Sequence, residues 1–222
     1  MTYIKWYTYR VSYIIEDSMD RKVVKKNRRE TIFTAAVKCF NKNGYYGTSM
    51  DMIAERAKIT KRGLYYHFKS KDELFIELFH YMNKKCYEQI PSFATEVSDP
   101  EERMLMFVKI ANQVVFANTD FLKFSHEFMS IGIRKPKIRK VFTSYYREQV
   151  ENVTQTIERG IESGKFLKTD PEKVARAIVL LTIGAFHVYF SLNADFELTD
   201  QHTFNVNHIL QGLKKDRTLL IH

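Results

Sequence analysis

The chain is poor in the residues that form turns and disulfides, since its 222 residues include only 2 Cys, 4 Pro and 8 Gly. So few Gly and Pro leave little material for the frequent tight turns of a sheet protein, and we predict an all-α fold. No apolar stretch approaches the roughly 20 residues that a membrane-spanning helix needs. Charges interrupt the Tyr-rich start where a signal peptide needs an unbroken apolar run, so we expect a cytoplasmic protein.

The sequence also lacks the motifs of several chemical functions. Cys39 and Cys86 stand in helix-like segments without metal-ligand spacing, which favours reduced structural thiols over a disulfide or a zinc site. There is no Gly-rich phosphate loop, no Glu-x-x-His pair and no activated Ser or Cys context. We expect no cofactor, no metal and no enzymatic activity, with a helical-bundle enzyme as the alternative from another class.

The positive charge is concentrated in one quarter of the chain. Residues 20–71 hold 14 Lys or Arg against 4 Asp or Glu, whereas residues 72–222 hold 19 against 20. An excess confined to one domain-sized block indicates a polyanionic partner, through counterion release from nucleic acid or attraction to anionic lipid. Charge alone leaves both partners open.

Helix signals divide this basic block into short helices. Asn27 can cap a helix whose apolar residues recur at three- and four-residue spacing until Gly44 ends it. The Ser-Lys-Asp-Glu run at 70–73 is a capping box that opens a longer helix. Residues 1–19 lack a clear period, and Met19 is an alternative translation start. Residues 1–22 are assigned to an N-terminal extension.

Residues 48–68, TSMDMIAERAKITKRGLYYHF, have the length and layout of a helix-turn-helix. Either Thr48 or Ser49 can cap the first helix, and Thr60 can cap the second, whose outer face would enter the major groove of DNA. The expected buried face of the first helix consists of Met52, Ile53 and Ala57.

The second helix carries a set of side chains that few helices expose together. If Leu64 and Phe68 face inward, its cationic and aromatic residues project outward. Each has a plain alternative, because an exposed cation is commonly just solvated and a Tyr is commonly a half-buried core residue. Their occurrence together inside the basic block favours contact with DNA. These residues are Lys61, Arg62, Tyr65 and Tyr66.

The run from Gly44 to Phe75, GYYGTSMDMIAERAKITKRGLYYHFKSKDELF, closely resembles the signature of the TetR family of transcriptional regulators. Residues 164–184, GKFLKTDPEKVARAIVLLTIG, are similar to the penultimate helix of the family. The resemblance implies a three-helix helix-turn-helix DNA-binding domain over residues 23–70. A long helix would join it to a helical-bundle domain for dimerisation and ligand binding over residues 71–222.

The resemblance also implies which residues contact DNA. Thr48 should meet a phosphate at the start of the first helix, where backbone N–H groups favour anions. Arg62 can make a bidentate contact with guanine. The implied groove-facing residues are Thr60, Lys61 and Arg62, and the implied phosphate or mixed contacts are Tyr65, Tyr66, His67 and Lys71. Gly63 completes the implied DNA-binding set.

Two positions depart from the usual family pattern. Lys58 stands in the turn where a glycine is common, so we expect it in a left-handed conformation at a cost of about 1 kcal/mol. In the second helix, Arg62 followed by Gly63 replaces an earlier glycine, so a long cation occupies a site of close backbone approach. The preferred operator sequence is therefore hard to transfer from relatives.

Beyond the basic block the pattern stays helical. Pro100 and Pro171 mark helix starts, because proline is tolerated in a first turn, where its missing N–H costs nothing. The break from Gly164 to Asp170 is the clearest boundary. Helices are expected over residues 100–117, 119–132, 136–163, 171–193 and 200–214.

The segment from Val174 to Leu192 is apolar on nearly every face, which a helix on the surface of a monomer does not tolerate. The resemblance implies that it packs, with the last helix, on the same two helices of a second copy as a four-helix dimer interface. The expected interface residues are Val174, Ile178, Leu181, Ala185, Phe204, Ile209 and Leu213.

The helices between 100 and 163 are rich in Phe and Met. These side chains permit two interpretations, because adaptable apolar residues form hydrophobic cores and also line ligand cavities. The resemblance implies a small-molecule pocket, and His126 and His187 are the polar residues suspected of holding a hydrogen-bonding group. The candidate lining residues are Met104, Phe107, Phe124, His126, Phe128, Tyr145 and His187.

These inferences describe a homodimeric repressor that binds an inverted-repeat DNA operator and is released by a small apolar or amphipathic ligand. Two further alternatives stay open. A ligand-independent DNA-binding protein would use the same helix-turn-helix for constitutive repression or chromosome organisation, and a filled core would favour it. A membrane-surface protein would use the basic block to bind anionic lipid.

Overall fold

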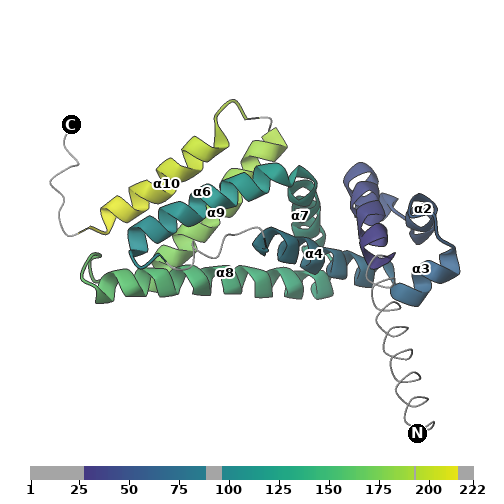
Figure 1. Ribbon diagram of the computed structural model, residues 1–222, viewed down its shortest axis with the longest axis horizontal. Helices are drawn as coiled ribbons and strands as arrows, with labels where there is room; N and C mark the ends of the chain where they lie inside the picture. The colour runs from purple at the N-terminus through teal and green to yellow at the C-terminus, as the bar shows by residue number, and fades with distance from the viewer. Residues whose placement is uncertain (1–27, 89–96, 193, 215–222) are drawn as a thin grey trace, which may run out of the picture. The chain divides into compact units, whose positions relative to one another are not determined.

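The computed structural model describes residues 28–88, 97–192 and 194–214 (Figure 1). Every regular element in these ranges is an α-helix, which confirms the all-α prediction. None of these helices is long and apolar enough to cross a membrane. The predicted extension and the predicted cap at Asn27 lie outside the described residues.

The chain divides into two compact units between Leu78 and Phe79. This division falls inside a helix, whereas the boundary expected from the sequence lies at residue 70. The helices of the first unit are residues 28–47, α2 (Met50–Arg56), α3 (Lys61–His67) and the start of α4 (Lys71–Tyr87).

Side-chain caps fix the starts of the short helices. Ser49 Oγ accepts from Met52 N at 3.1 Å, so Ser49 caps α2, and Thr60 Oγ1 accepts from Gly63 N at 3.1 Å at the start of α3. Each bond satisfies a backbone N–H that has no partner within its own helix. Both caps are among the predicted residues.

The capping box before α4 is also present. Glu73 N donates to Ser70 Oγ at 3.1 Å, and the Glu73 carboxylate accepts from Lys69 N at 2.8 Å. Gly44 takes a φ of 68°, the left-handed conformation that glycine adopts without a steric penalty. The helix nevertheless continues to residue 47, so the prediction that Gly44 ends it was wrong by three residues.

The buried face of α2 differs from the prediction at one residue. Met50, Ile53 and Ala54 are buried, as is Ala57 beyond the helix, whereas Met52 is 37% exposed. The buried positions follow the spacing i, i+3, i+4, i+7 of one helix face, and Met52 lies off that face. The prediction for Met52 was therefore wrong.

The second unit holds the remaining helices, whose bounds agree with the predicted ranges to within two residues. They pack as neighbours, with α8 against α7 and α9, and α10 against α6 and α9 (Figure 1). They are α6 (Pro100–Ala117), α7 (Thr119–Gly132), α8 (Pro136–Glu162), α9 (Pro171–Leu192) and α10 (Leu198–Gly212).

The break between α8 and α9 contributes to the core. Phe166 is buried, and its ring lies so close to Gly160 of α8 that a Cβ there would collide with it. Its neighbours in the core come from α6, α8, α9 and α10, and this cluster holds four helices together. The other buried members are Met104, Val108, Ile157, Ile178, Val206, Leu210 and Leu213.

A buried polar group joins three of these helices. His202 is on α10. Its Nδ1 lies 2.8 Å from Asn112 Oδ1 on α6, and its Nε2 lies 2.8 Å from Thr182 Oγ1 on α9. Burial lowers the pKa of His202 to about 4, so the ring is neutral near pH 7. The group connects α6, α9 and α10 through side chains rather than backbone.

We predict that His202 makes the stability of the fold depend on pH. The unfolded chain binds a proton near the ordinary His pKa of 6.5, whereas the folded chain binds it only near 4. The unfolded state therefore holds more protons between these values, and acidification from pH 7 to pH 5 should lower the free energy of unfolding by about 2 kcal/mol through this residue. Urea titrations of the unaltered chain and of His202→Gln at both pH values measure it, and an equal loss in the two proteins would contradict the prediction.

Candidate nucleic-acid interface

The turn between α2 and α3 is held by backbone hydrogen bonds. Lys58 N donates to Glu55 O and Ile59 N donates to Ala54 O, both at 3.0 Å. Lys58 has a φ of 53°, and among the described residues it is the one non-glycine residue with a positive φ. The expectation of a left-handed Lys58 is confirmed, so the turn has the geometry that a glycine would adopt without strain.

Helix α3 presents the expected residues to solvent. Leu64 and Phe68 are completely buried, and the Phe68 ring packs at 5.5 Å from the ring of Phe33. Lys61 and Arg62 are exposed, as are the two tyrosines of this helix, Tyr66 to 77%. The inward and outward sides of α3 are therefore those predicted.

The two cations of α3 differ in their local partners. Lys61 Nζ donates to the Asp51 carboxylate at 2.9 Å, and this hydrogen bond raises the pKa of Lys61. The side chain of Arg62 makes no ion pair or hydrogen bond with any residue that the structure describes. Arg62 therefore has its full set of guanidinium donors available to a ligand.

Gly63 and Thr60 depend on each other. A Cβ at position 63 would lie 3.2 Å from Thr60 Oγ1, closer than most real contacts. Glycine at this position therefore suits the cap of α3, and it gives a local reason for the order Arg62-Gly63. Thr60 itself is exposed beside these residues, and His67 at the other end of α3 is half-buried.

Thr48 lies inside the unit rather than on its surface. The residue is 1% exposed. Its hydroxyl donates to Gly44 O at 2.7 Å, and Cys39 O is a second acceptor at 3.1 Å. These bonds tie the start of α2 to the end of the preceding helix. The hydroxyl of Thr48 is committed to this connection, which was not predicted from the sequence.

The side chain of Lys71 also bonds to backbone carbonyls of the first unit. Its Nζ donates to Tyr45 O and to Thr48 O, both at 2.7 Å, and it lies 4.4 Å from the centre of the Tyr45 ring. Tyr45 Oη in turn bonds to the Asp72 carboxylate. This ammonium group therefore binds carbonyl oxygens between the first helix and α2, where it offsets their partial negative charge.

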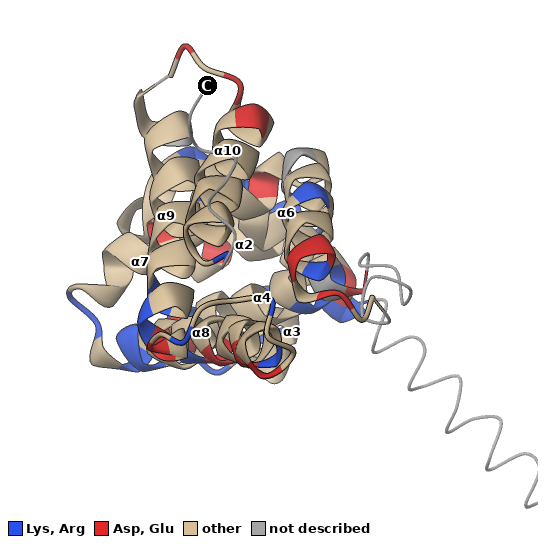
Figure 2. Ribbon diagram, turned by 90° about the vertical axis from the view of Figure 1, so that its left-hand side faces the viewer, with Lys and Arg blue, Asp and Glu red and all other residues tan. Residues whose placement is uncertain are grey.

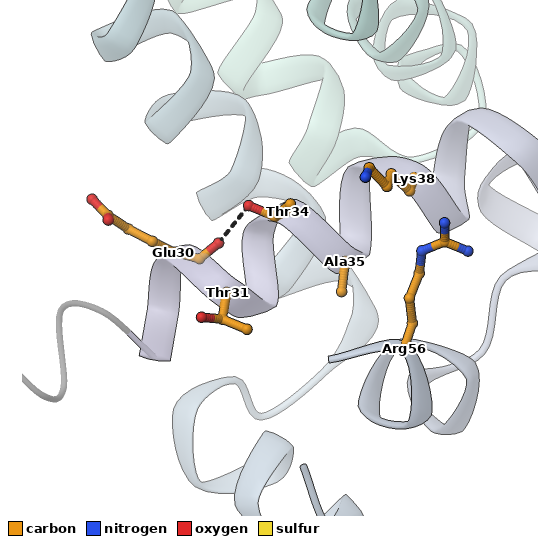
Figure 3. Close-up of a pocket in the computed structure, with 6 residues that line it drawn as sticks. All are labelled: Glu30, Thr31, Thr34, Ala35, Lys38 and Arg56. Atoms are coloured by element: carbon orange, nitrogen blue, oxygen red, sulfur yellow. Dashed lines mark hydrogen bonds between the residues drawn. The ribbon is translucent and has the colours of Figure 1, made fainter. Parts of the chain in front are cut away.

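A hollow of about 470 Å³ lies beside the helix over residues 28–47 (Figure 3). Thr34 Oγ1 donates to Glu30 O at 2.9 Å on its wall. Most of its side chains are polar and exposed, unlike those of an apolar ligand pocket. It is lined by Glu30, Thr31, Thr34, Ala35, Lys38 and Arg56, and none of the predicted pocket residues is among them.

In the second unit, the predicted pocket residues fall into separate groups. Phe124 and Phe128 are completely buried, and the Phe128 ring stacks on that of Phe79 at 4.1 Å. Tyr145 meets the same Phe79 ring edge-on at 5.6 Å. Met104 belongs instead to the core cluster around Phe166. These aromatic rings fill space against one another.

The remaining pocket candidates lie nearer the surface. The rings of His126 on α7 and His187 on α9 are 4.1 Å apart. Burial lowers the pKa of His126, and the neighbouring His187 acts in the same direction. Phe107 is half-buried with the Arg103 guanidinium 5.8 Å from its ring. Within the described residues, no three His, Cys, Asp or Glu side chains gather as a metal site would require.

Both cysteines are free thiols in environments that disfavour the reactive thiolate. Cys39 is buried and Cys86 is half-buried. Burial raises the pKa of Cys39 and raises that of Cys86 to about 11. A thiol that stays protonated at neutral pH is a poor nucleophile.

The predicted dimer residues divide between core and surface. Ile178 and Leu213 are buried in the protomer core, with Val174 and Ile209 packed against it, because α9 and α10 turn these sides toward α6 and α8. Ala185 is half-buried. Leu181 and Phe204 are exposed, Phe204 to 63%. Three further apolar residues of α9 are exposed and were not predicted from the sequence, namely Leu180, Val188 and Leu192.

Comparisons with known proteins agree with this geometry. The family described as "Bacterial regulatory proteins, tetR family" matches residues 32–78. The uncharacterized HTH-type transcriptional regulator YhgD of Bacillus subtilis (strain 168) is 30% identical over 164 residues, which span 71% of this chain and 81% of that protein.

Solved structures share the fold over most of this chain. A TetR transcription regulator from Haloarcula marismortui superposes with a TM-score of 0.76 at 20% identity, covering 86% of this chain and 100% of its own. The regulator FadR from Bacillus subtilis, in complex with stearoyl-CoA, gives a TM-score of 0.70 at 17% identity, covering 83% and 98%. At these identities the likeness shows the fold.

The strained turn predicts a stabilising substitution. Lys58→Gly should raise the free energy of unfolding by up to about 1 kcal/mol, because glycine removes the steric penalty of the left-handed backbone. Denaturant titration measures the change. Lys58→Ala is the matched control, since it removes the same charge but keeps the Cβ, and equal effects of the two substitutions would show that the charge, not the backbone, is responsible.

Proposed function

Because the chain belongs to the TetR family of bacterial regulatory proteins, and is therefore a DNA-binding transcriptional regulator and not an enzyme, we propose that it is a dimeric, ligand-released repressor. The observation that carries the proposal is the outer face of α3, where Arg62, Tyr65 and Tyr66 are exposed around a buried Leu64. A regulator of a bacterial chromosome would act in the cytoplasm.

The first turn of α3 is the part that reads DNA bases. In a helix-turn-helix, residues near the start of the second helix contact base edges in the major groove. Arg62 lies in that turn, and its planar guanidinium suits O6 and N7 of guanine. Thr60 and Lys61 flank it, while Tyr65, Tyr66 and His67 are proposed to contact the sugar-phosphate backbone.

Thr48 and Lys71 have a supporting part in this proposal. Their polar side-chain atoms bond to backbone carbonyls around the first helix, as described above. Through these bonds they set the position of α2 and of the turn that precedes it. They therefore orient the phosphate-contacting backbone at the start of α2 more than they supply contacts of their own.

The dimer is proposed to form through α9 and α10. Exposed Leu181, Val188 and Leu192 recur at intervals of seven and four residues, so they share one side of α9. Phe204 is exposed on α10, and its ring stacks on that of His208 at 5.7 Å. Exposed apolar residues gathered in this way favour an interface, and a two-fold dimer matches an inverted-repeat operator.

Release by a ligand is supported by similarity alone. The B. subtilis FadR structure contains stearoyl-CoA, so a protein of this fold holds an acylated ligand. We propose that a small apolar or amphipathic ligand binds the second unit, near the aromatic cluster of Phe79, Phe124 and Phe128. A ligand that binds one dimer conformation better than the other shifts the population away from the DNA-bound state.

One observation favours a second candidate, a ligand-independent repressor or chromosome organiser. Phe124 and Phe128 are completely buried, and their rings pack 6.1 Å apart, so they fill space that a ligand would need. The two functions differ in a simple readout. A ligand-released repressor leaves its operator when the right small molecule is added, whereas a ligand-independent protein stays bound.

The decisive experiment is a gel shift with the DNA upstream of the gene that encodes this chain. The proposal expects a retarded band at nanomolar protein that resists competition by random-sequence DNA. Footprinting should then locate two half-sites related by a dyad. Absence of binding to any promoter fragment, even at low salt, would reject the function proposed here.

Arg62→Ala is predicted to weaken operator binding by about 5- to 150-fold, since a bidentate contact with guanine contributes about 1 to 3 kcal/mol of discrimination. Binding to random-sequence DNA should change much less. Arg56→Ala is the matched control, because Arg56 is an exposed arginine of the same unit that lies in the hollow beside the first helix. A similar loss in both variants would argue against base recognition by Arg62.

Charge placed in the exposed apolar face should abolish dimerisation. Leu192→Glu with Phe204→Glu would bury two unpaired carboxylates from each protomer at the proposed interface, and removing each charge from water costs on the order of several kcal/mol. Sedimentation velocity should show a dimer for the unaltered chain and a monomer for the double variant. Ile133→Glu, at a residue 72% exposed on the turn between α7 and α8, should stay dimeric. A dimer that survives the double substitution would place the interface elsewhere.

A further inference from the structure

A second concentration of positive charge lies in the second unit, where the net charge is close to zero. From Phe128 to Arg147 the chain has six Lys or Arg and no Asp or Glu. These residues surround the turn between α7 and α8 and the first half of α8, a region with much blue ribbon in Figure 2. We name this region the α7–α8 basic surface, and its cations are Arg134, Lys135, Lys137, Arg139, Lys140 and Arg147.

The turn that carries these cations is rigidly held. Arg139 donates through Nε to Gly132 O at 3.0 Å, and through Nη2 to Ile133 O. A Cβ on Gly132 would lie 3.4 Å from the Cα of Arg139, so the end of α7 closely approaches the start of α8. The backbone that carries the charges is therefore held in place, and no backbone entropy need be lost at this turn when the charges bind a partner.

Several of the cations form one continuous face. Lys137, Lys140 and Arg147 stand three and seven residues apart on α8, a spacing that returns to the same side of a helix, and all three are exposed. Ten residues of helix extend about 15 Å. Double-stranded DNA carries one phosphate charge per roughly 1.7 Å of axis, so this face can run past several phosphates.

Four of the six cations have no acidic partner among the described residues. Arg134, Lys137, Lys140 and Arg147 make no ion pair with any residue that the structure describes, whereas exposed cations elsewhere in the unit do, such as Arg176 with Glu172. The first turn of α8 also has no acidic residue and no side-chain cap. Cations at the positive end of a helix dipole destabilise it, so this arrangement costs stability when no anion is near.

We propose that the α7–α8 basic surface binds the phosphate backbone of DNA beside the operator, so that the second unit adds a sequence-independent part to the affinity. This inference rests on the DNA-binding function proposed above. Many clusters of cations are merely solvated, but four of the six cations here make no ion pair with a described residue, the turn beside them is held by hydrogen bonds, and the first turn of α8 places cations at the positive end of its dipole. A membrane surface is the less favoured partner. Of the residues described on this turn, Ile133 is the one large apolar side chain that is strongly exposed, and membrane-binding helices bury a broad apolar face.

The salt dependence of DNA binding tests the proposal. Each phosphate interaction that a substitution removes should lower the slope of log affinity against log salt by about 0.9, so Lys137→Gln with Lys140→Gln should flatten it by up to about 1.8. The matched control is Lys109→Gln with Lys168→Gln, two lysines of the same unit outside this surface. The full-length dimer is titrated against a long duplex that contains the operator and against a random-sequence duplex, and the surface variant should show the same flattening on both.

An unchanged slope, with operator binding intact, would overturn this inference and leave the proposed repressor function standing. Absence of DNA binding by the unaltered chain would contradict both. Sedimentation with vesicles of mixed phosphatidylcholine and phosphatidylserine provides the alternative outcome. Vesicle binding that the surface variant loses and the control keeps, together with an unchanged DNA slope, would show that the surface serves a membrane instead.

Discussion

The burial of Leu64 and Phe68 determines how the first unit can use its charges. Both side chains are completely buried, and Phe68 lies against Phe33 with the Arg29 guanidinium 4.7 Å from its ring. Burying each such side chain contributes about 2 kcal/mol. Leu64 on α3 and Phe68 at its C-cap are both turned inward, and this rotation of the helix leaves Arg62 and Tyr66 facing outward. A helix of seven residues has little stability of its own, so its orientation depends on such contacts with the rest of the unit.

Local signals were the predictable part of the structure. The caps at Ser49 and Thr60, the capping box at Ser70 and the left-handed Lys58 all depend on neighbours within a few residues, and the sequence contains those neighbours. Helix bounds in the second unit followed from proline and from three- to four-residue spacing for the same reason. Met52 was misplaced because the apolar run of α2 permits two adjacent faces, and only the packing of the unit selects one.

The choice of partner was the unpredictable part. A threonine before a helix and a lysine at the start of another are equally suited to a phosphate or to a carbonyl of their own chain, and Thr48 and Lys71 bond to carbonyls. The aromatic residues raised the same difficulty, because Phe128 can line a cavity or fill one. On α9 the nearly continuous apolar pattern concealed two opposite sides, with Val179 in the core and Val188 in solvent. Sequence periodicity reports that a side chain is apolar, but not which surface covers it.

The group formed by Asn112, Thr182 and His202 has a consequence for motion. Its two contacts of 2.8 Å join α6, α9 and α10 at one depth in the bundle. Breaking a buried hydrogen bond leaves polar groups unsatisfied, at a cost of about 1 to 3 kcal/mol, unless new partners are found. These bonds hold the three helices in one relative position. Any rearrangement among the helices must break the bonds, so it occurs as a discrete step between bonded states. The group therefore sets a minimum free-energy cost for any change in the packing of α6, α9 and α10.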